Sequence, residues 1–513
     1  MRFLNLFYKT KLIFGKDVPL HPFYCETNPQ VMVKQKRKVL FFAALILLLF
    51  SLYLLAFSPL STNRFFAQAD NNGVDLPQII ERGVLRATTN LNSTNYFVYR
   101  GEPMGFHFEL LRLFAEHIGV ELEIYATNDP DENLNCLLAE NECDVIAIDF
   151  PVTKSGSNLV RFIEPHNQER QVLVQRKPDN YHLMRQQDME ALQLRNQLDL
   201  DGKTIYVPRN SVFVERLQNL MQETGAAIDI VEVDYDAEQL IEMVSNGSID
   251  FTVSHEHLAR INASYFENID FRTPLSFPQK LAWAVRRNAP LLQAALSDWM
   301  TEFKDTPQFV HLYNRYFNNP RNAYIARSPF SSLGGGKISV FDSYFRQHAD
   351  IVGWDWRLIA SVAFQESRFN PDAVSWAGAR GIMQLMPATA EIFDIDSTSS
   401  ISDHIYAGVS YLLWLENTLA NHIPDSTERI KFVLAAYNVG IGHVMDAIRL
   451  AKKHGKNPEV WTGNVDYFVL NKSNPKYYQD EVVRFGFARG SEPYAFVIEI
   501  LDRFRHYKNV SGL

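Results

Sequence analysis

Residues 363–371, AFQESRFNP, place a carboxylate on the apolar face of a predicted helix. Asp355 is a suitable N-cap, and apolar residues recur after it with helical spacing. Glu366 lies four residues after Val362, so it shares the apolar face. Pro371 predicts that the helix ends near residue 370. Glutamate is rarely buried without a partner or a purpose, and an apolar setting raises its pKa, as a general acid requires.

Taken alone, such a glutamate is more often a surface group that reaches solvent or pairs with Arg368 or Arg380. The sequence that follows favours a catalytic role instead. Ser375 comes next, then AGARGIMQLMPATA at 377–390 and LAAYNVG at 434–440.

These motifs, in this order, resemble the lysozyme-like domain of soluble-type lytic transglycosylases over roughly residues 339–513. The resemblance implies a mainly α-helical domain that cleaves the β-1,4 bond between N-acetylmuramic acid and N-acetylglucosamine in peptidoglycan without water. The product would carry a 1,6-anhydromuramic acid end. No cofactor and no metal is implied. Glu366 would be the single catalytic carboxylate, with substrate contacts from Ser375, Met383, Gln384, Tyr437, Asn438 and, in the late helix, Tyr494.

Two other functions fit the same domain. A goose-type lysozyme has this fold but hydrolyses the bond, so its product would have a reducing muramic acid end. A non-enzymatic sensor of the cell wall would bind the glycan only, and the presence of Glu366 among the other motifs argues against it.

The N-terminal region carries a charge opposite to that of the rest of the chain. The 513 residues have a net charge of −9, but residues 1–38 contain eight Lys or Arg and two acids. The acidic remainder excludes typical nucleic-acid binding. Residues 39–57 are apolar and uncharged, long enough to span a bilayer, and the basic segment before them predicts a cytoplasmic N-terminus. Ala67-Gln68-Ala69 leaves a cleaved signal as the alternative.

An uncleaved span would anchor the protein in the inner membrane, with residues from about 70 onward on the periplasmic side. A cleaved signal would be compatible with the outer membrane, where members of the family are often found. Cys136 and Cys143 are both on the exported side; a disulfide and a pair of small buried thiols are equally compatible with the sequence.

Between the apolar run and the catalytic motifs, strands alternate with helices, which predicts an α/β architecture. Two such sets in series predict two lobes with a cleft between them. A helix is expected at 108–118 and a turn at 101–105. The expected strands are residues 84–89, 121–125, 144–148, 204–207, 228–233 and 249–253.

This segment resembles the family 3 periplasmic solute-binding proteins over roughly residues 76–322. The resemblance is carried by GVLR at 83–86, GFHFELL at 105–111, CDV at 143–145 and GSID at 247–250. The amino-acid binders of that family hold the ligand carboxylate with an arginine three residues after a threonine.

Aligning Thr153 with that threonine puts Gly156 at the arginine position, and the aspartate for the ligand's amino group falls at His255. Both ionic contacts are therefore missing. A muropeptide or stem peptide is the better expected ligand; a scaffold that binds nothing is the alternative.

Gly- and Ser-rich sequence at 327–337 predicts a flexible linker. The predicted division is a basic cytoplasmic segment (1–38), a membrane anchor or signal (39–57), a solute-binding-like domain (76–322), a linker (323–338) and a lytic transglycosylase domain (339–513). The expected partners are peptidoglycan strands and the membrane.

Overall fold

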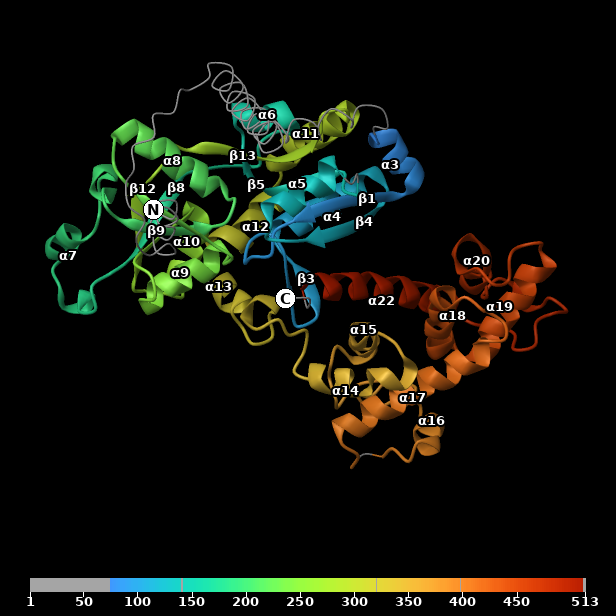
Figure 1. Ribbon diagram of the computed structural model, residues 1–513. Helices are drawn as coiled ribbons and strands as arrows, with labels where there is room; N and C mark the ends of the chain where they lie inside the picture. Colours follow the sequence, from blue (N-terminus) through green and yellow to red (C-terminus); the bar gives the residue numbers. More distant parts are fainter. Residues whose placement is uncertain (1–73, 140–141, 320, 397, 511–513) are drawn as a thin grey trace, which may run out of the picture. The chain divides into compact units, whose positions relative to one another are not determined.

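The computed structural model describes residues 74–139, 142–319, 321–396 and 398–510. The basic segment at 1–38 and the apolar run at 39–57 lie outside these residues. Within the described part, no helix combines the length and the apolar character needed to cross a bilayer. The described residues belong to one compact unit, and Figure 1 labels most of its elements.

The first lobe is built on a mixed sheet with strand order β4-β1-β5-β13-β6, to which β7 is added beside β13. Strands β4, β1 and β5 are parallel, and β13 runs antiparallel to its neighbours. The strands are β1 (Val84–Thr89), β4 (Glu121–Ala126), β5 (Val145–Pro151), β6 (Val160–Phe162), β7 (Asn167–Glu169) and β13 (Gln279–Arg286). Its helices are α3 (Leu76–Arg82), α4 (Phe106–Ile118), α5 (Pro130–Leu138), α6 (Lys154–Leu159) and α11 (Pro290–Lys304).

The second lobe has strand order β10-β9-β11-β8-β12. The chain enters it between β7 and β8 and returns to the first lobe between β12 and β13. The two-lobed α/β fold predicted from the sequence is therefore confirmed. The strands are β8 (Gln171–Arg176), β9 (Thr204–Pro208), β10 (Asp229–Val233), β11 (Phe251–His255) and β12 (Ile269–Pro274); the helices are α7 (Gln186–Leu192), α8 (Val212–Thr224), α9 (Ala237–Asn246) and α10 (Glu256–Ala263), with 3-10 turns η2 (Tyr181–Leu183) and η3 (Gln197–Leu200).

The region predicted as a turn at 101–105 is half of a β-hairpin. Strands β2 (Phe97–Tyr99) and β3 (Glu102–Met104) pair antiparallel and turn at Arg100 and Gly101, both with positive φ. A side chain on Gly101 would lie 2.5 Å from the ring of Phe364 and 2.7 Å from the Tyr507 hydroxyl, so this turn requires glycine.

Cys136 and Cys143 form a disulfide, with their Cα atoms 5.3 Å apart. Cys136 belongs to α5, and the backbone N–H groups of Glu142 and Cys143 donate to its carbonyl. The bond therefore ties the end of α5 to the start of β5.

The segment assigned to the linker is not an open coil. It contains helix α13 (Arg321–Ala326) and the 3-10 turn η5 (Ser332–Gly334), after α12 (Pro307–Tyr313) and the π-helical turn η4 (Asn314–Asn318). The Phe330 carbonyl accepts from the Arg100 N–H, and the Ser332 hydroxyl accepts from the Val98 N–H. These bonds to the β2–β3 hairpin order a segment whose composition alone predicts flexibility.

The C-terminal region is helical, as predicted. Helix α15 packs against α14 and α22, and α18 packs against α17, α19 and α22. The elements are α14 (Asp342–Val352), α15 (Trp356–Ser367), α16 (Pro387–Ile392), α17 (Ile401–Leu419), α18 (Ser426–Val439), α19 (Ile441–Lys453), η6 (Trp461–Val465), α20 (Asp466–Leu470), α21 (Pro475–Tyr478) and α22 (Ser491–Val510).

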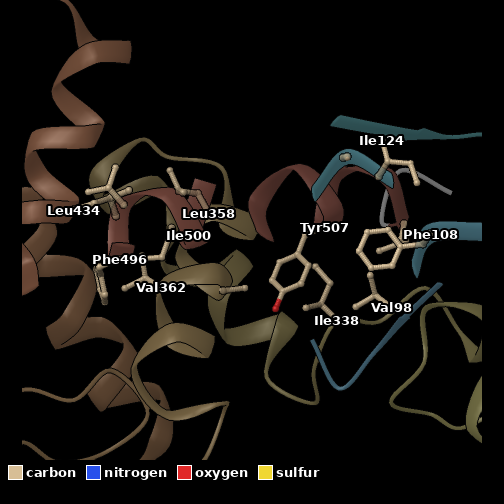
Figure 2. Close-up of a cluster of buried hydrophobic side chains, with 14 of the residues drawn as sticks. Val98, Phe108, Ile124, Ile338, Leu358, Val362, Leu434, Phe496, Ile500 and Tyr507 are labelled. Carbon is tan, nitrogen blue, oxygen red and sulfur yellow. The ribbon is translucent and has the colours of Figure 1, made fainter. Parts of the chain in front are cut away.

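Helix α22 contributes to packing over its whole length (Figure 2). Near its start, Phe496 and Ile500 lie among Leu358, Val362 and Leu434 from α15 and α18. Near its end, Tyr507 is buried beside a second set of apolar residues and donates a 3.1 Å hydrogen bond to the Gly101 carbonyl. The second set is Val98, Phe108, Ile124 and Ile338.

Candidate active site

Glu366 is placed at the end of α15 by ordinary helix signals. Asp355 is the N-cap and accepts from the Arg357 N–H, as predicted. Residues 358–364 are all buried. The helix ends at Ser367 because Arg368 adopts the left-handed conformation, with φ 53° and ψ 40°. It stops slightly earlier than Pro371 alone would require.

The Glu366 carboxyl lies in an apolar setting. It is mostly shielded from solvent and accepts no hydrogen bond from the described residues. Burial raises the pKa of Glu366 to about 8, and no charged neighbour contributes to that shift. A second carboxylate close by would also raise the pKa, and an arginine or lysine would lower it. The group is therefore protonated at neutral pH and stands alone electrostatically.

The loop after α15 is fixed by its own backbone and by two predicted site residues. The Ser375 hydroxyl accepts from the Ala379 N–H at 3.0 Å. The Gln384 amide donates to the carbonyls of Ala373 and Gly381, both at 2.9 Å, which leaves its oxygen free to accept. Gly381 has φ +79°, and a Cβ there would lie 2.7 Å from the His404 ring, so only glycine fits.

Met383 and Tyr437 connect this loop to the helical core. Met383 is 1 % exposed and packs on Gly408 of α17, so its side chain fills the core in this conformation. The Tyr437 hydroxyl donates to the Met383 carbonyl at 2.7 Å. Burial and then the charge of Glu366 raise the pKa of Tyr437 well above its usual value. The hydroxyl of Ser367, the residue after Glu366, donates to the neighbouring Ile382 carbonyl, so the Tyr437 phenol lies near the end of α15.

The two remaining predicted residues are less closely associated with Glu366. Asn438 follows Tyr437 on α18 and is exposed. Tyr494, on α22, lines a separate depression together with Tyr467 and Tyr477. The structure therefore brings together the loop, Met383 and Tyr437, whereas Tyr494 lines a depression whose described lining does not include Glu366.

Two residues that contribute to this site were not among the predicted substrate-contacting residues. The Ser367 hydroxyl donates to the Ile382 carbonyl at 2.8 Å and so joins α15 to the loop. Tyr411 of α17 lies against Tyr437, with ring centroids 5.4 Å apart. Tyr411 occurs in an ordinary helical pattern, so nothing in the local sequence marks it.

The two lobes of the N-terminal part enclose a second candidate site, a cavity of about 460 Å³. Thr153, Gly156 and His255 all line it, so the positions that would supply the missing ionic contacts face the cavity. Thr153 caps α6 and accepts from the Gly156 N–H. No Lys or Arg occurs among the described lining residues, whereas six asparagines do: Asn90, Asn92, Asn95, Asn128, Asn133 and Asn210.

Direct hydrogen bonds cross this cavity from one lobe to the other. Ser93 donates its hydroxyl and its N–H to the Glu238 carboxylate at 2.7 and 2.9 Å. The Asn210 amide donates to Asp131 at 2.8 Å. The lobes are therefore held together in this conformation.

A buried histidine cluster lies at the base of the cavity. The Nε2 atoms of His107, His166 and His257 lie 3.3, 3.1 and 3.5 Å from the Asp149 carboxylate. His107, His166 and Asp149 have the spacing of a metal site. However, the Trp283 indole N–H donates to His107 Nδ1 at 2.6 Å, so neutral His107 carries its proton on Nε2. That proton points at Asp149, where a metal would need a lone pair, so this arrangement does not suit a metal ion.

Comparison with protein families matches two parts of the chain. Residues 86–206 match the family of bacterial extracellular solute-binding proteins, family 3, and residues 343–460 match the transglycosylase SLT domain. A crystal structure of a mutant of ArgBP from T. maritima is similar to 47 % of this chain and 99 % of its own, at 21 % identity and a TM-score of 0.41.

Two relatives each match more than four-fifths of the chain. The chain is 32 % identical over 429 residues to the membrane-bound lytic murein transglycosylase F of Desulfosudis oleivorans, which covers 83 % of this chain and 90 % of that protein. It is 29 % identical over 419 residues to the protein of the same name from Idiomarina loihiensis, over 81 % and 88 % of the two chains. The chain therefore belongs to the membrane-bound lytic murein transglycosylase F family.

Proposed function

We propose that Glu366 alone carries out the acid–base chemistry of a lytic transglycosylase acting on peptidoglycan. Its carboxyl first donates a proton to the oxygen of the β-1,4 bond between N-acetylmuramic acid and N-acetylglucosamine, and the C1–O bond breaks. The resulting carboxylate then takes the proton of the muramic acid C6 hydroxyl while O6 bonds to C1. The carboxyl is restored, and the product ends in 1,6-anhydromuramic acid.

The isolation of Glu366 carries this proposal. Hydrolysing glycosidases usually employ two carboxylates, one of which activates water or attacks the sugar. Here burial alone raises the pKa of the glutamate to about 8. Intramolecular attack by the C6 hydroxyl needs no positioned water, since the nucleophile is part of the substrate. Ser375, the Gln384 oxygen, Tyr437 and Asn438 are proposed to contact the sugars.

Mass spectrometry of the products tests the reaction. Purified peptidoglycan digested by the full chain should yield anhydromuropeptides, and Glu366→Gln should yield none. Asp372→Asn is a matched control, because Asp372 is the next acid along the chain, lies exposed after the helix, and should be dispensable. Muropeptides with reducing muramic acid ends would instead identify a goose-type hydrolase, and glycan binding without cleavage by the unaltered chain would identify a sensor.

We propose that the cavity between the lobes binds a muropeptide or stem peptide and thereby regulates the catalytic part. Asn128 and Asn133 use both ends of their amides within the protein. The Nδ2 groups of Asn90, Asn92 and Asn95 and the Oδ1 of Asn210 make no hydrogen bond within the described residues, so they suit a ligand rich in amide groups. The absence of lysine and arginine from the described lining disfavours an ordinary amino acid held by its carboxylate.

A physical connection exists for such regulation. The β2–β3 hairpin of the first lobe contacts Phe364 of the catalytic helix through Gly101, and Tyr507 of α22 donates to the Gly101 carbonyl. Calorimetry on the full-length Glu366→Gln protein should detect binding of stem peptides but not of free amino acids. Binding of neither would favour a scaffold that has lost its ligand.

We propose that residues 39–57 anchor the chain in the inner membrane, with the catalytic part in the periplasm. Intact mass measurement of the protein purified from membranes tests this directly. Retention of the N-terminal 57 residues supports an anchor, whereas loss of the residues up to Ala69 identifies a cleaved signal and leaves the outer membrane as the location.

A further inference from the structure

Three aromatic rings lead from the catalytic carboxyl to the protein surface. Tyr437 lies near the end of α15 that carries Glu366, because the Tyr437 and Ser367 hydroxyls donate to the adjacent carbonyls of Met383 and Ile382. The Tyr437 ring contacts Tyr411, with ring centroids 5.4 Å apart. Tyr411 in turn stacks on Trp414, with centroids 5.7 Å apart and ring planes at 10°. Trp414 is 49 % exposed, so the last ring of the series meets solvent.

Helix α17 carries both Tyr411 and Trp414 and so determines where the series of rings reaches the surface. Tyr411 and Trp414 are three residues apart and therefore lie on one face of the helix. That face meets α18, because Tyr411 contacts Tyr437. Tyr406 of the same helix is 48 % exposed but contacts His348 of α14, on the other side. Tyr406 and Trp414 are therefore about equally exposed but lie next to different helices. Only Trp414 is linked through ring contacts, by way of Tyr411, to Tyr437.

The chemistry of the surface suits a sugar. A pyranose ring presents axial C–H groups on one face, and these pack against an aromatic ring while the hydroxyls stay hydrated or hydrogen bonded. Burial alone raises the pKa of the Tyr411 hydroxyl, which therefore stays a neutral donor. The Trp414 indole and this hydroxyl can thus offer one apolar face and two donors to a saccharide.

We propose that Tyr411 and Trp414 form an additional saccharide-binding position for the glycan strand, outside the two sugars that flank the cleaved bond. The series of rings starts at Glu366 and leads away from it, so the sugar on Trp414 is one that is held but not cleaved. Trp414 is then a binding residue that favours long strands over short ones. This inference depends on the proposed role of Glu366 in cleaving the strand.

The test compares Trp414→Ala with Trp414→Phe and Tyr406→Ala in the full chain. The substrates are long peptidoglycan strands and a tetrasaccharide that fills only positions around the cleaved bond. Loss of roughly 50 Å² of apolar contact, at about 25 cal/mol per Å², corresponds to about tenfold in binding. Trp414→Ala should lower kcat/KM about tenfold on long strands, mainly through KM, and leave the tetrasaccharide rate within about twofold. Trp414→Phe should recover most of the loss.

Tyr406→Ala is the control for removing an equally exposed aromatic side chain from α17, and it should leave both rates unchanged. In a Glu366→Gln background, Trp414→Ala should weaken binding of long strands about tenfold by calorimetry. Equal losses on long and short substrates, or a loss matched by Tyr406→Ala, would overturn the inference. An active Glu366→Gln protein would instead overturn the catalytic proposal, so the two failures are distinguishable.

Discussion

Replacing Glu366 by glutamine should stabilise the protein at neutral pH while abolishing cleavage. Burial raises the pKa of Glu366 from an ordinary 4.5 to about 8. In the unfolded chain the group ionises near pH 4.5, so the folded state holds a proton that solvent would remove. At pH 7 this costs about 3 kcal/mol, from 1.36 kcal/mol per pH unit. The side chain keeps some contact with solvent, which reduces the figure to about 1–2 kcal/mol.

The sign follows from the raised pKa. Below pH 4.5 both states are protonated, and the wild-type side chain contributes its full stability. As the pH rises towards 8, that contribution is lost from the wild-type protein, whereas glutamine does not titrate. The melting temperature of Glu366→Gln should therefore exceed that of the wild type by about 1–2 °C at pH 8 and match it at pH 4.5.

Thermal unfolding followed by circular dichroism at pH 4.5, 7 and 8.5 measures this difference. Glu391→Gln serves as the control, because Glu391 is exposed on α16 and its replacement should not alter the pH dependence. A difference between Glu366→Gln and wild type that is constant with pH would refute the reasoning, as would a glutamine variant that is less stable at pH 8.5.

Three further measurements follow from the same physics. With a pKa of about 8, Glu366 is about 90 % protonated at pH 7 and about 10 % at pH 9, so the cleavage rate should fall about tenfold between them if the proton donor is this group. Lys472→Met should cost about 1–3 kcal/mol in urea unfolding, since it removes a 2.7 Å partner from the buried Asp446, which keeps its ion pair with Arg449. Lys453→Met, in a more exposed pair, should cost less than about 1 kcal/mol. Burial lowers the pKa of His257 to about 3 while the lobes are closed. If the lobes open and expose His257, its pKa rises to about 6.5, so a fall in pH below that value should favour the open form. Spin-label distances across the cavity should then lengthen in the wild type and stay constant in His257→Gln.

The elements with strong local signals could be predicted from the sequence. The strand expected at 84–89 is β1 as observed, and Asp355 caps α15 as expected. These features depend on alternation, apolar spacing and capping chemistry, all of which act over a few residues. The position of Glu366 on the apolar face of α15 belongs with them, because it is visible in a single turn of sequence. Its proposed catalytic role depended on the motifs that follow it.

Features that depend on distant contacts could not be predicted in this way. Met383 belongs to a sugar-binding motif by resemblance, yet it is 1 % exposed because Gly408 of α17 leaves room for it. The β2–β3 hairpin was expected as a turn, since its strands are only three residues long and β2 forms a bridge to the distant Ser331, which the local sequence does not show. The proposed sugar-binding role of Tyr411 and Trp414 could not be predicted from the sequence, because it depends on the packing of α17 against α18.

The isolation of Glu366 would also allow one carboxylate to serve both halves of the proposed reaction. The group must be protonated to release the leaving sugar and ionised to accept the C6 proton, so its pKa must lie near the ambient pH. A neighbouring cation would hold it ionised, and a second acid would hold one of the two protonated. Burial without either partner raises the pKa to about 8, about one unit above neutrality, where each proton transfer costs about 1.4 kcal/mol or less. The apolar face of α15 is therefore sufficient to tune the acid, and this is why the preceding helix residues matter as much as the carboxyl itself.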